Sequence, residues 1–442
     1  FFSCAIHAAD SPAAGLGKSS RYDDNFRALC AAKPRDRYAS IKCLKPAPRV
    51  QLALGGDLRL REEVGDPTKL AGGKPIRDSY LLERALLDAD LRFGDNARVF
   101  VQLGYHLVQY RAGAAKSTDN DRTDLQQGFV DFGGNIGDGR LTERFGRQEV
   151  SFGASRLMSV RERSNIRRAF DATNTIWTGD EWNVRALFGH PVLPRPGAFD
   201  DIADHSQALW GVYASSKRHD LDVYYLGYLN RNAKFAGVPG EERRQTLGVR
   251  AGTKAHGWDG EVEAVGQFGS FAGRDIHAFG VYTVGGYTWK DVPWQPRIGL
   301  RADALSGDRH PGNSSVGTFN PLFGSSSYFT QAGYNTAANL YDLYPSLRVS
   351  PTAKLSFELG YDDLWRYSTR DAFYQSPLTV VFAGNASSAR HIGTQSQLSG
   401  NWRPNSYLQF NMALVHFTPG AFALAAGGRS ANFTMGSVAL RF

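Results

Sequence analysis

The chain has 442 residues, a formal net charge of +8 and 48 glycines, and aromatic residues make up 12% of it. This length suits two or three soluble domains or one large barrel. The sequence contains no run of about 20 apolar residues, which excludes a protein that crosses membranes with helices. Short segments rich in Tyr, Phe, Val and Leu and separated by glycine favour an all-β protein.

The first ten residues, FFSCAIHAAD, run from apolar to small side chains. We interpret residues 1–9 as the remnant of a secretory signal peptide that is cleaved near Ala8 or Ala9. Acylation of Cys4 in a poor lipobox is the alternative.

Residues 10–48 are polar and basic, contain several prolines and show no sustained period. We predict a periplasmic N-terminal segment or plug in this range. Cys30 and Cys43 lie close together in an exported chain, which suggests a disulfide that closes a small loop. Two unpaired thiols are the alternative.

The first strand pattern is RVQLALGGDLRLREEV (Arg49–Val64). One register is apolar, and the other carries Asp57, Arg59 and Arg61. Alternate side chains of a strand point to opposite faces, so this strand has one apolar face and one charged face. We expect the leucines to face lipid and the charged side chains to face a wet lumen.

The same alternation returns along the rest of the chain. It is clear in residues 97–110, 258–271, 295–308 and 353–365. Weaker segments lie near 80–93, 124–132, 140–149, 166–177, 181–190, 207–216, 219–229, 242–256, 274–289, 339–350, 388–403, 405–417 and 431–442. Together they make about eighteen strands, an even number such as bacterial outer-membrane barrels have.

Short turns such as GDNA (Gly94–Ala97) alternate with long polar stretches such as the one from His310 to Asn339. The chain ends SVALRF, and Phe442 shares a register with apolar side chains, which is typical of the last strand of an outer-membrane barrel. We therefore predict that residues 49–442 form a transmembrane antiparallel β-barrel in the bacterial outer membrane, with short periplasmic turns and longer extracellular loops. No fixed repeat supports a propeller.

The inward positions of this barrel collect cations. A basic side chain on the lipid face would cost about 2–4 kcal/mol at the bilayer midplane, and residues 159–171 add four arginines. The predicted anion-contacting residues are Arg59, Arg61, Arg84, Arg147, Arg161, Arg163, Arg167, Arg168, Arg250, Arg301 and Arg348. Arginines that line a passage raise the local anion concentration, and the guanidinium fork suits carboxylates.

Acidic residues share the inward face. The predicted lumenal acids are Asp57, Asp88, Glu261, Glu263, Asp303 and Glu358. Arg–Asp and Arg–Glu ladders are the ordinary way to fill a barrel interior, so the surplus of arginine, and no single pair, carries the functional prediction.

Other chemistry has little support. The histidines show no metal-ligand spacing and no nucleophile motif occurs, so we expect neither an enzyme nor a cofactor. Nucleic-acid binding is not expected, because the positive charge alternates with lipid-facing residues. Weak calcium candidates are the loop acids Asp200, Asp201, Asp204 and Asp308, for which solvation is the commoner explanation.

Six stretches carry a resemblance to a known family. They are LGGDLRLREE (Leu54–Glu63), RFGRQEVSFGASRLMSVRERSNIRRAFD (Arg144–Asp171), RPGAFDDIADHSQALWGVYAS (Arg195–Ser215), GWDGEVEAVGQFG (Gly257–Gly269), SGDRHPGNSSVGTFNPLF (Ser306–Phe323) and the terminal ALRF. From roughly Arg49 to Phe442 the chain resembles the alginate export outer-membrane proteins. The resemblance implies an eighteen-stranded barrel with an arginine-lined conduit for a polyuronate and with loops that gate its ends. The N-terminal basic segment is not part of the pattern.

We therefore expect an anion-selective channel that exports an anionic polysaccharide, an alginate-like polyuronate. The alternative is a diffusive uptake porin for small carboxylates such as aromatic or sugar acids. A polymer conduit should show a continuous cationic track, whereas a small-solute porin should show one narrow eyelet. The expected partners are the lipid bilayer with its lipopolysaccharide, the anionic solute and periplasmic export proteins, and a barrel of this size can work as a monomer.

Overall fold

The computed structural model describes residues 24, 26–31, 40–74, 76–235, 237–325 and 327–442. The predicted signal remnant, residues 1–9, lies outside the described residues, as does Cys4. Within the described ranges, no helix has the length and apolar character needed to cross a membrane.

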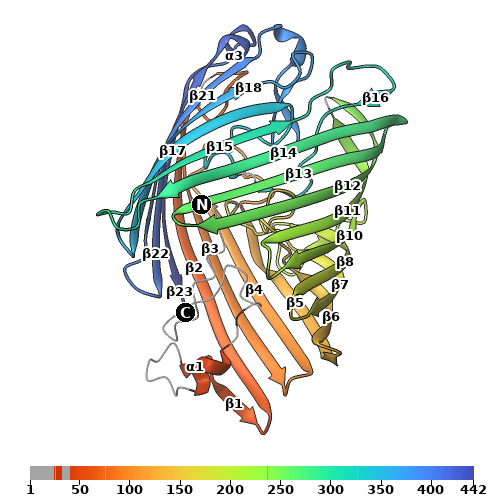
Figure 1. Cartoon of the computed structure of the whole chain (residues 1–442), viewed down its shortest axis with the longest axis vertical. Coiled ribbons are helices and arrows are strands. Elements are labelled where there is room, and N and C mark those ends of the chain that lie inside the picture. The colour runs from red at the N-terminus through yellow and green to blue at the C-terminus, as the bar shows by residue number, and fades with distance from the viewer. Residues whose placement is uncertain (1–23, 25, 32–39, 75, 236, 326) are drawn as a thin grey trace.

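An antiparallel β-barrel accounts for most of the chain (Figure 1). Its sheet has 21 strands, of which 18 close the barrel. The barrel strands are β2 (Val50–Asp66), β3 (Asp78–Phe93), β4 (Ala97–Gln109), β5 (Asp121–Ile136), β6 (Gly139–Gln148), β7 (Phe170–Thr178), β8 (Trp182–Leu193), β10 (Gln207–Ser216), β11 (Leu221–Phe235), β12 (Val238–Ala255), β13 (Trp258–Phe271), β14 (Arg274–Thr288), β15 (Arg297–Leu305), β17 (Leu340–Thr352), β18 (Leu355–Trp365), β21 (His391–Trp402), β22 (Leu408–Pro419) and β23 (Ala431–Arg441). The predicted fold class is confirmed.

Short elements decorate the ends of the barrel. Those paired to barrel strands are β1 (Leu44–Ala47), β9 (Ile202–Ala203) and β16 (Ser315–Val316). The others are α1 (Arg27–Ala31), β19 (Phe373–Gln375), β20 (Thr379–Phe382), η2 (Gly384–Ala386) and α3 (Ala421–Ala425).

The barrel closes where β2 pairs with β23, in a register that runs from Asp57 opposite Arg441 to Asp66 opposite Asn432. Arg441 Nε donates to Asp57 Oδ2 at 2.7 Å across this seam. Phe442 exchanges two backbone hydrogen bonds with Gly56. A Cβ at Gly56 would come within 2.6 Å of the Phe442 ring, so only glycine lets the ring approach the seam this closely.

The two faces of β2 follow the predicted alternation. Leu58 and Leu60 are exposed on the outer face, where lipid would cover them, whereas Asp57, Arg59 and Arg61 are buried in the interior. The apolar band outside and the charged wall inside are what a membrane barrel requires.

The two rims of the barrel differ. Short turns such as residues 94–96 lie at the rim that also holds β1 and the C-terminal end, and long connections such as residues 306–339 lie at the opposite rim, near α3 (Figure 1). By the usual arrangement of such barrels, the short-turn rim is periplasmic and the long-loop rim is extracellular.

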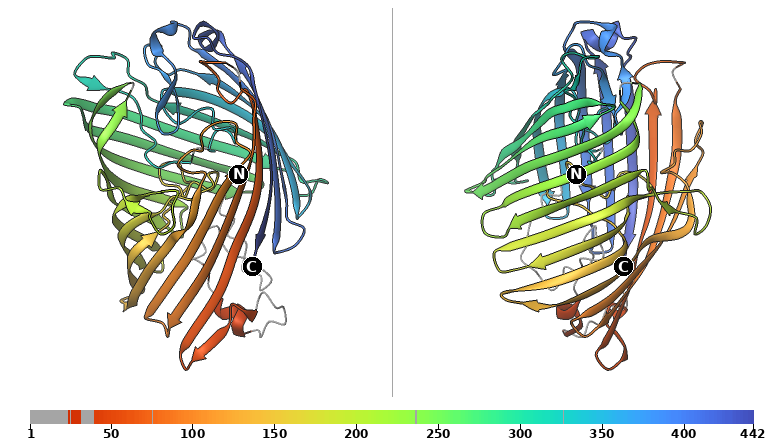
Figure 2. Two further views of the ribbon diagram at one scale, coloured as in Figure 1. Left: turned by 180° about the vertical axis from the view of Figure 1, so that it is seen from behind. Right: turned by 90° about the vertical axis from the view of Figure 1, so that its right-hand side faces the viewer.

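Two of the long connections fold inward instead of outward (Figure 2). The β6–β7 loop (residues 149–169) and the β15–β17 loop (residues 306–339) are joined by a parallel bridge between Met158 and Phe323. Ser159 N donates to Phe323 O at 3.1 Å, and Ser325 N donates to Ser155 O at 3.0 Å. The strand that we predicted near 166–177 begins only at Phe170, because the preceding residues belong to this inserted loop.

The described part of the N-terminal segment lies against the periplasmic end of the barrel. Cys30 and Cys43 form a disulfide, with their Cα atoms 5.3 Å apart. Lys42 Nζ donates to Leu54 O at 2.5 Å and to Phe442 O at 2.9 Å. The segment is therefore attached to both sides of the seam that closes the barrel.

Candidate functional site

The β6–β7 loop crosses the interior from one wall to the opposite one. At one end, Asn165 Nδ2 donates to three backbone oxygens, those of Glu83, Leu107 and Asp119, at 2.9–3.1 Å. At the other end, Arg156 forms ion pairs with Glu261 and Glu263 on β13 at 2.7 and 2.8 Å. Strands β3 and β13 lie on opposite sides of the ring of strands, so the loop is anchored across the lumen.

Glu162, in the middle of this loop, lies among three predicted cations. Arg84 donates to its carboxylate, Arg167 Nε lies 3.1 Å from it, and Arg59 Nη1 lies 3.6 Å from it. Burial opposes the ionisation of Glu162, but Arg84, Arg167 and Arg59 outweigh burial and hold its pKa well below the usual range. Glu162 therefore carries a fixed negative charge inside a positive surrounding.

Most predicted cations face the interior but are neutralised there. Nine of the eleven have a carboxylate within 4.0 Å. The pairs outside the Glu162 cluster are Arg61–Glu63, Arg163–Glu63, Arg147–Asp171, Arg250–Asp222, Arg250–Glu261, Arg301–Asp342, Arg301–Asp362 and Arg348–Glu358. Paired guanidiniums of this kind fill the wall and have little charge left to offer to a passing anion.

Arg161 and Arg168 are the two exceptions: within the described parts of the chain, neither has a carboxylate partner. Arg168 donates to Phe323 O and stacks its guanidinium over the Phe323 ring, 5.0 Å from the ring centroid. Burial and the charge of Arg161 lower the pKa of Arg168. Burial also lowers the pKa of Arg161, to about 10, so Arg161 keeps its charge at neutral pH. An anion bound between Arg161 and Arg168 would stabilise both charged guanidinium groups and so offset the cost of their burial and of their mutual repulsion.

The predicted lumenal acids serve as partners of these arginines. Asp57 pairs with Arg441 and Arg84, Glu263 with Arg156, and Asp303 lies 3.7 Å from Arg301. The remaining three are Glu261 and Glu358, which are also paired, and Asp88, which faces inward on β3. The acids thus account for most of the apparent surplus of positive charge.

Sequence reasoning missed three residues of this region: Arg156, Glu162 and Asn165. One signal for Glu162 was available, because it is the only acid among the four arginines of residues 161–168. Arg156 and Asn165 gave no such signal, since their partners lie far away in the sequence.

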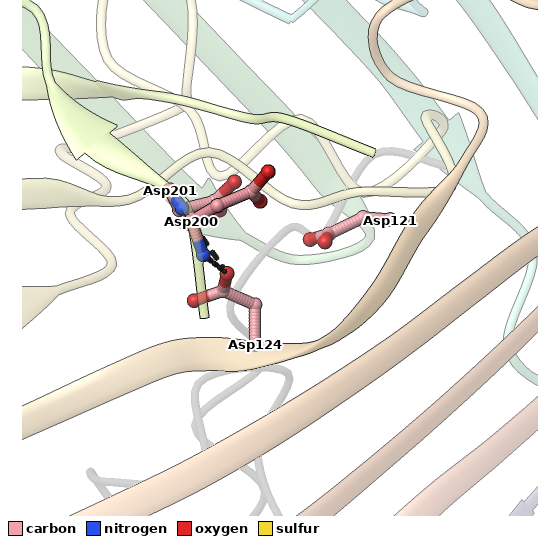
Figure 3. A group of neighbouring side chains, drawn as sticks. All are labelled: Asp121, Asp124, Asp200 and Asp201. Carbon is pink, nitrogen blue, oxygen red and sulfur yellow. Dashed lines mark hydrogen bonds between the residues drawn. The ribbon is translucent and has the colours of Figure 1, made fainter. Parts of the chain in front are cut away.

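The four calcium candidates separate in the structure. Asp200 and Asp201 lie beside Asp121 and Asp124 (Figure 3). Asp204 instead accepts hydrogen bonds from Ser206 and Gln207. The fourth candidate, Asp308, lies 3.3 Å from Arg274.

Residues 50–437 match the family described as Alginate export. No curated protein sequence matches the chain.

Solved structures of barrels from Pseudomonas aeruginosa share the fold over 88% of this chain and 98% of theirs. OccK8 (OprE) is 10% identical with a TM-score of 0.55. OpdK, solved with vanillate, is 8% identical with a TM-score of 0.57. OccK2 (OpdF), in complex with glucuronate, is 10% identical with a TM-score of 0.56. At these identities the likeness concerns the fold.

Proposed function

This chain belongs to the alginate export family and is a β-barrel channel of the bacterial outer membrane, and on that premise we propose that it is selective for anions. The cargo that we propose first is an anionic polysaccharide, an alginate-like polyuronate that leaves the cell through the barrel. Its carboxylates would contact Arg161 and Arg168, the predicted cations for which the described residues supply no acidic partner.

Arg161 and Arg168 support the proposal because of their position. They belong to the loop that crosses the lumen, so a solute that passes the loop meets them. Guanidinium groups bind carboxylates through two parallel hydrogen bonds, and in a partly dehydrated passage this attraction is stronger than in water. The paired arginines of the wall would contribute weaker contacts along the way, which is what conduction needs.

The second candidate function is diffusive uptake of small carboxylates, and one observation favours it. Within the described parts of the chain, the predicted cations that lack a carboxylate partner are confined to residues 161–168 and do not form a track from rim to rim. Two barrels with the same fold were solved with small carboxylates, vanillate and glucuronate. A single narrow anion site would serve monomers better than a polymer.

In the export proposal the chain works as a monomer and catalyses no reaction. Periplasmic partners would deliver the polymer, and the N-terminal segment at the periplasmic rim would serve as a plug or as their docking site. Lipid and lipopolysaccharide would surround the apolar outer face.

Single-channel recording in a planar bilayer tests the proposal. We expect a reversal potential under a salt gradient that reports anion preference, and block by a polyuronate added to the periplasmic side. Replacement of both residues, Arg161→Gln with Arg168→Gln, should lower the anion-to-cation permeability ratio by about tenfold, the low end of what charged clefts achieve.

Arg243→Gln is the matched control, since Arg243 is an exposed arginine outside the lumen that pairs with Glu241. It should leave the permeability ratio unchanged. Equal ratios in the double variant and the wild type would refute the role of Arg161 and Arg168. Block by small carboxylates alone would replace export by uptake.

A further inference from the structure

Four aspartates from two distant parts of the chain lie close together (Figure 3). Asp121 and Asp124 begin β5, and Asp200 and Asp201 belong to the connection between β8 and β9. One carboxylate oxygen of each lies within 4.8 Å of the corresponding oxygens of the other three. Two oxygens that bind the same calcium ion can be at most about 5 Å apart, so this spacing suits one shared ion.

Asp121 points into this group without a hydrogen-bond donor of its own. It is 3% exposed, and its carboxylate faces the other three (Figure 3). Its Oδ1 has no hydrogen-bond partner, and its Oδ2 lies 3.7 Å from His106 Nδ1, too far for a hydrogen bond. Within the described residues, both ring nitrogens of the buried His106 lack hydrogen-bond partners as well. A buried carboxylate in this state needs a proton or a cation.

The surrounding positive charge does not balance the four acids. The nearest guanidinium is that of Arg147, 3.8 Å from Asp124 Oδ1, and it already holds Asp171 with two hydrogen bonds of 2.8 and 3.1 Å. Among the described residues, these four carboxylates have no other ion pair apart from the His106 contact. A divalent cation would correct this deficit.

Backbone N–H groups orient three of the acids. Asp200 N and Asp201 N donate to Asp124 Oδ2 at 2.8 and 3.1 Å, Arg195 N donates to Asp201 Oδ1, and Gly197 N donates to Asp200 Oδ2. Asp200 Oδ1 is buried without a partner, as is Asp121 Oδ1. The two free oxygens therefore come from different segments and belong to the same group.

We propose that Asp121, Asp124, Asp200 and Asp201 form a calcium site that fastens the β8–β9 connection to the start of β5. All the donors are hard oxygens, which excludes a preference for zinc or copper. Calcium accepts six to eight oxygen ligands in flexible geometry, whereas magnesium rarely occupies a cage made only of protein groups.

Backbone hydrogen bonds hold the connection along β5. Arg122 N donates to Gly197 O and Phe199 N donates to Thr123 O, each at 3.2 Å. The ion would add bonds between the same two segments. Its loss should therefore loosen this loop and leave the barrel intact.

Calcium titration of the purified, chelator-treated barrel in detergent tests the site. We expect one calcium per chain with a dissociation constant on the order of 0.1–1 mM, the range of extracellular calcium modules. Calcium should also raise the melting temperature, because it binds only the folded state. Asp121→Asn and Asp200→Asn should each weaken binding by about tenfold or more. Asp204→Asn is the matched control, from the same connection but outside the group.

Several outcomes would overturn the site. They are no heat of calcium binding in the wild type, equal binding in Asp200→Asn and the wild type, or equal loss in Asp204→Asn. Equal affinity for magnesium would overturn the assignment to calcium. Asp200→Asn lies in a connection outside the barrel strands, so it keeps the test valid if Asp121→Asn fails to fold. None of these measurements depends on ion selectivity, so they succeed or fail independently of the proposed export function.

Discussion

Two clusters of charged side chains in the barrel interior have opposite compositions. In the Arg301 cluster, one guanidinium holds Asp342 and Asp362 at 2.8 Å each and lies 3.7 Å from Asp303. In the Glu162 cluster, one carboxylate lies among Arg59, Arg84 and Arg167. The first has an excess of acid and the second an excess of base.

Exposure distinguishes the two clusters more than charge does. The Arg301 side chain is 2% exposed and is packed against the Tyr344 ring, 4.5 Å from its centroid. The Glu162 side chain is 41% exposed to the interior space. Burial without water makes the ions of the first cluster depend on one another for stability. In the second cluster the arginines are buried, at 6%, 1% and 3% exposure, so Glu162 is the member whose charge can act on a solute.

The largest expected effect comes from breaking the closed cluster. Arg301→Gln leaves buried carboxylates without a counter-ion, and we expect it to lower the free energy of unfolding by about 3–5 kcal/mol. Urea unfolding of the purified barrel measures the change. Adding Asp362→Asn to this variant should restore part of the lost free energy of unfolding, because it removes one of the carboxylates that lack a counter-ion.

A loss below about 1 kcal/mol in Arg301→Gln would contradict this account, since it would mean that water or protons already stabilise the three acids.

A smaller effect on stability is expected from the open cluster. Glu162→Gln should cost about 1–2 kcal/mol, because the buried arginines keep other partners: Arg84 keeps Asp57, Arg167 keeps Glu149, and Arg59 keeps two backbone oxygens. Removal of the negative charge should raise the anion-to-cation permeability ratio, measured by reversal potential. Glu241→Gln is a control with equal exposure outside the lumen, also 41%. An unchanged ratio in Glu162→Gln would show that the cluster is shielded from the solute path.

The smallest expected effect is a change of stability and anion preference with pH, caused by the ionisation of Glu149. This residue faces Arg167, Glu162, Arg84 and Gln126. Burial raises the pKa of Glu149 to about 7, although Arg167 opposes this. Because this pKa lies above the ordinary value, the contribution of Glu149 to stability is full below about pH 4 and is lost as pH rises through about 7. Over that range the new carboxylate offsets part of the charge of Arg167, so anion preference should fall slightly.

Reversal potentials recorded at a series of pH values measure this fall in anion preference, which should appear as a step near pH 7. Glu149→Gln should abolish it. A step of the same size in that variant would assign it to another group.

The barrel could be predicted because the alternation of apolar and polar residues that specifies its strands is local in the sequence. Alternation in stretches such as Arg49–Val64 depends only on which side meets lipid, and it gave the strands, their faces and their approximate number. The strand ends were less accurate where a neighbouring loop decides them, as at Phe170. There, packing of the preceding residues into the lumen overrides the local pattern.

The site was less predictable because its partners are distant in sequence. Which arginines remain free depends on the acids that register places beside them, as for Arg301 with Asp362 on a strand two places away. The path of the β6–β7 loop depends on the bridge from Met158 to Phe323 and on the bonds of Asn165. The acid group joins Asp121 to Asp200, which no local pattern connects.

Lys42 has a consequence for the order of assembly. Its ammonium group binds one oxygen from the first barrel strand, that of Leu54, and one from Phe442 beyond the last strand. Leu54 is available as soon as β2 exists, but Phe442 reaches its position only when β23 has joined β2. The complete contact can therefore form only after the ring is finished. The N-terminal segment thus distinguishes a closed barrel from one that is still open, and it settles fully only on the closed form.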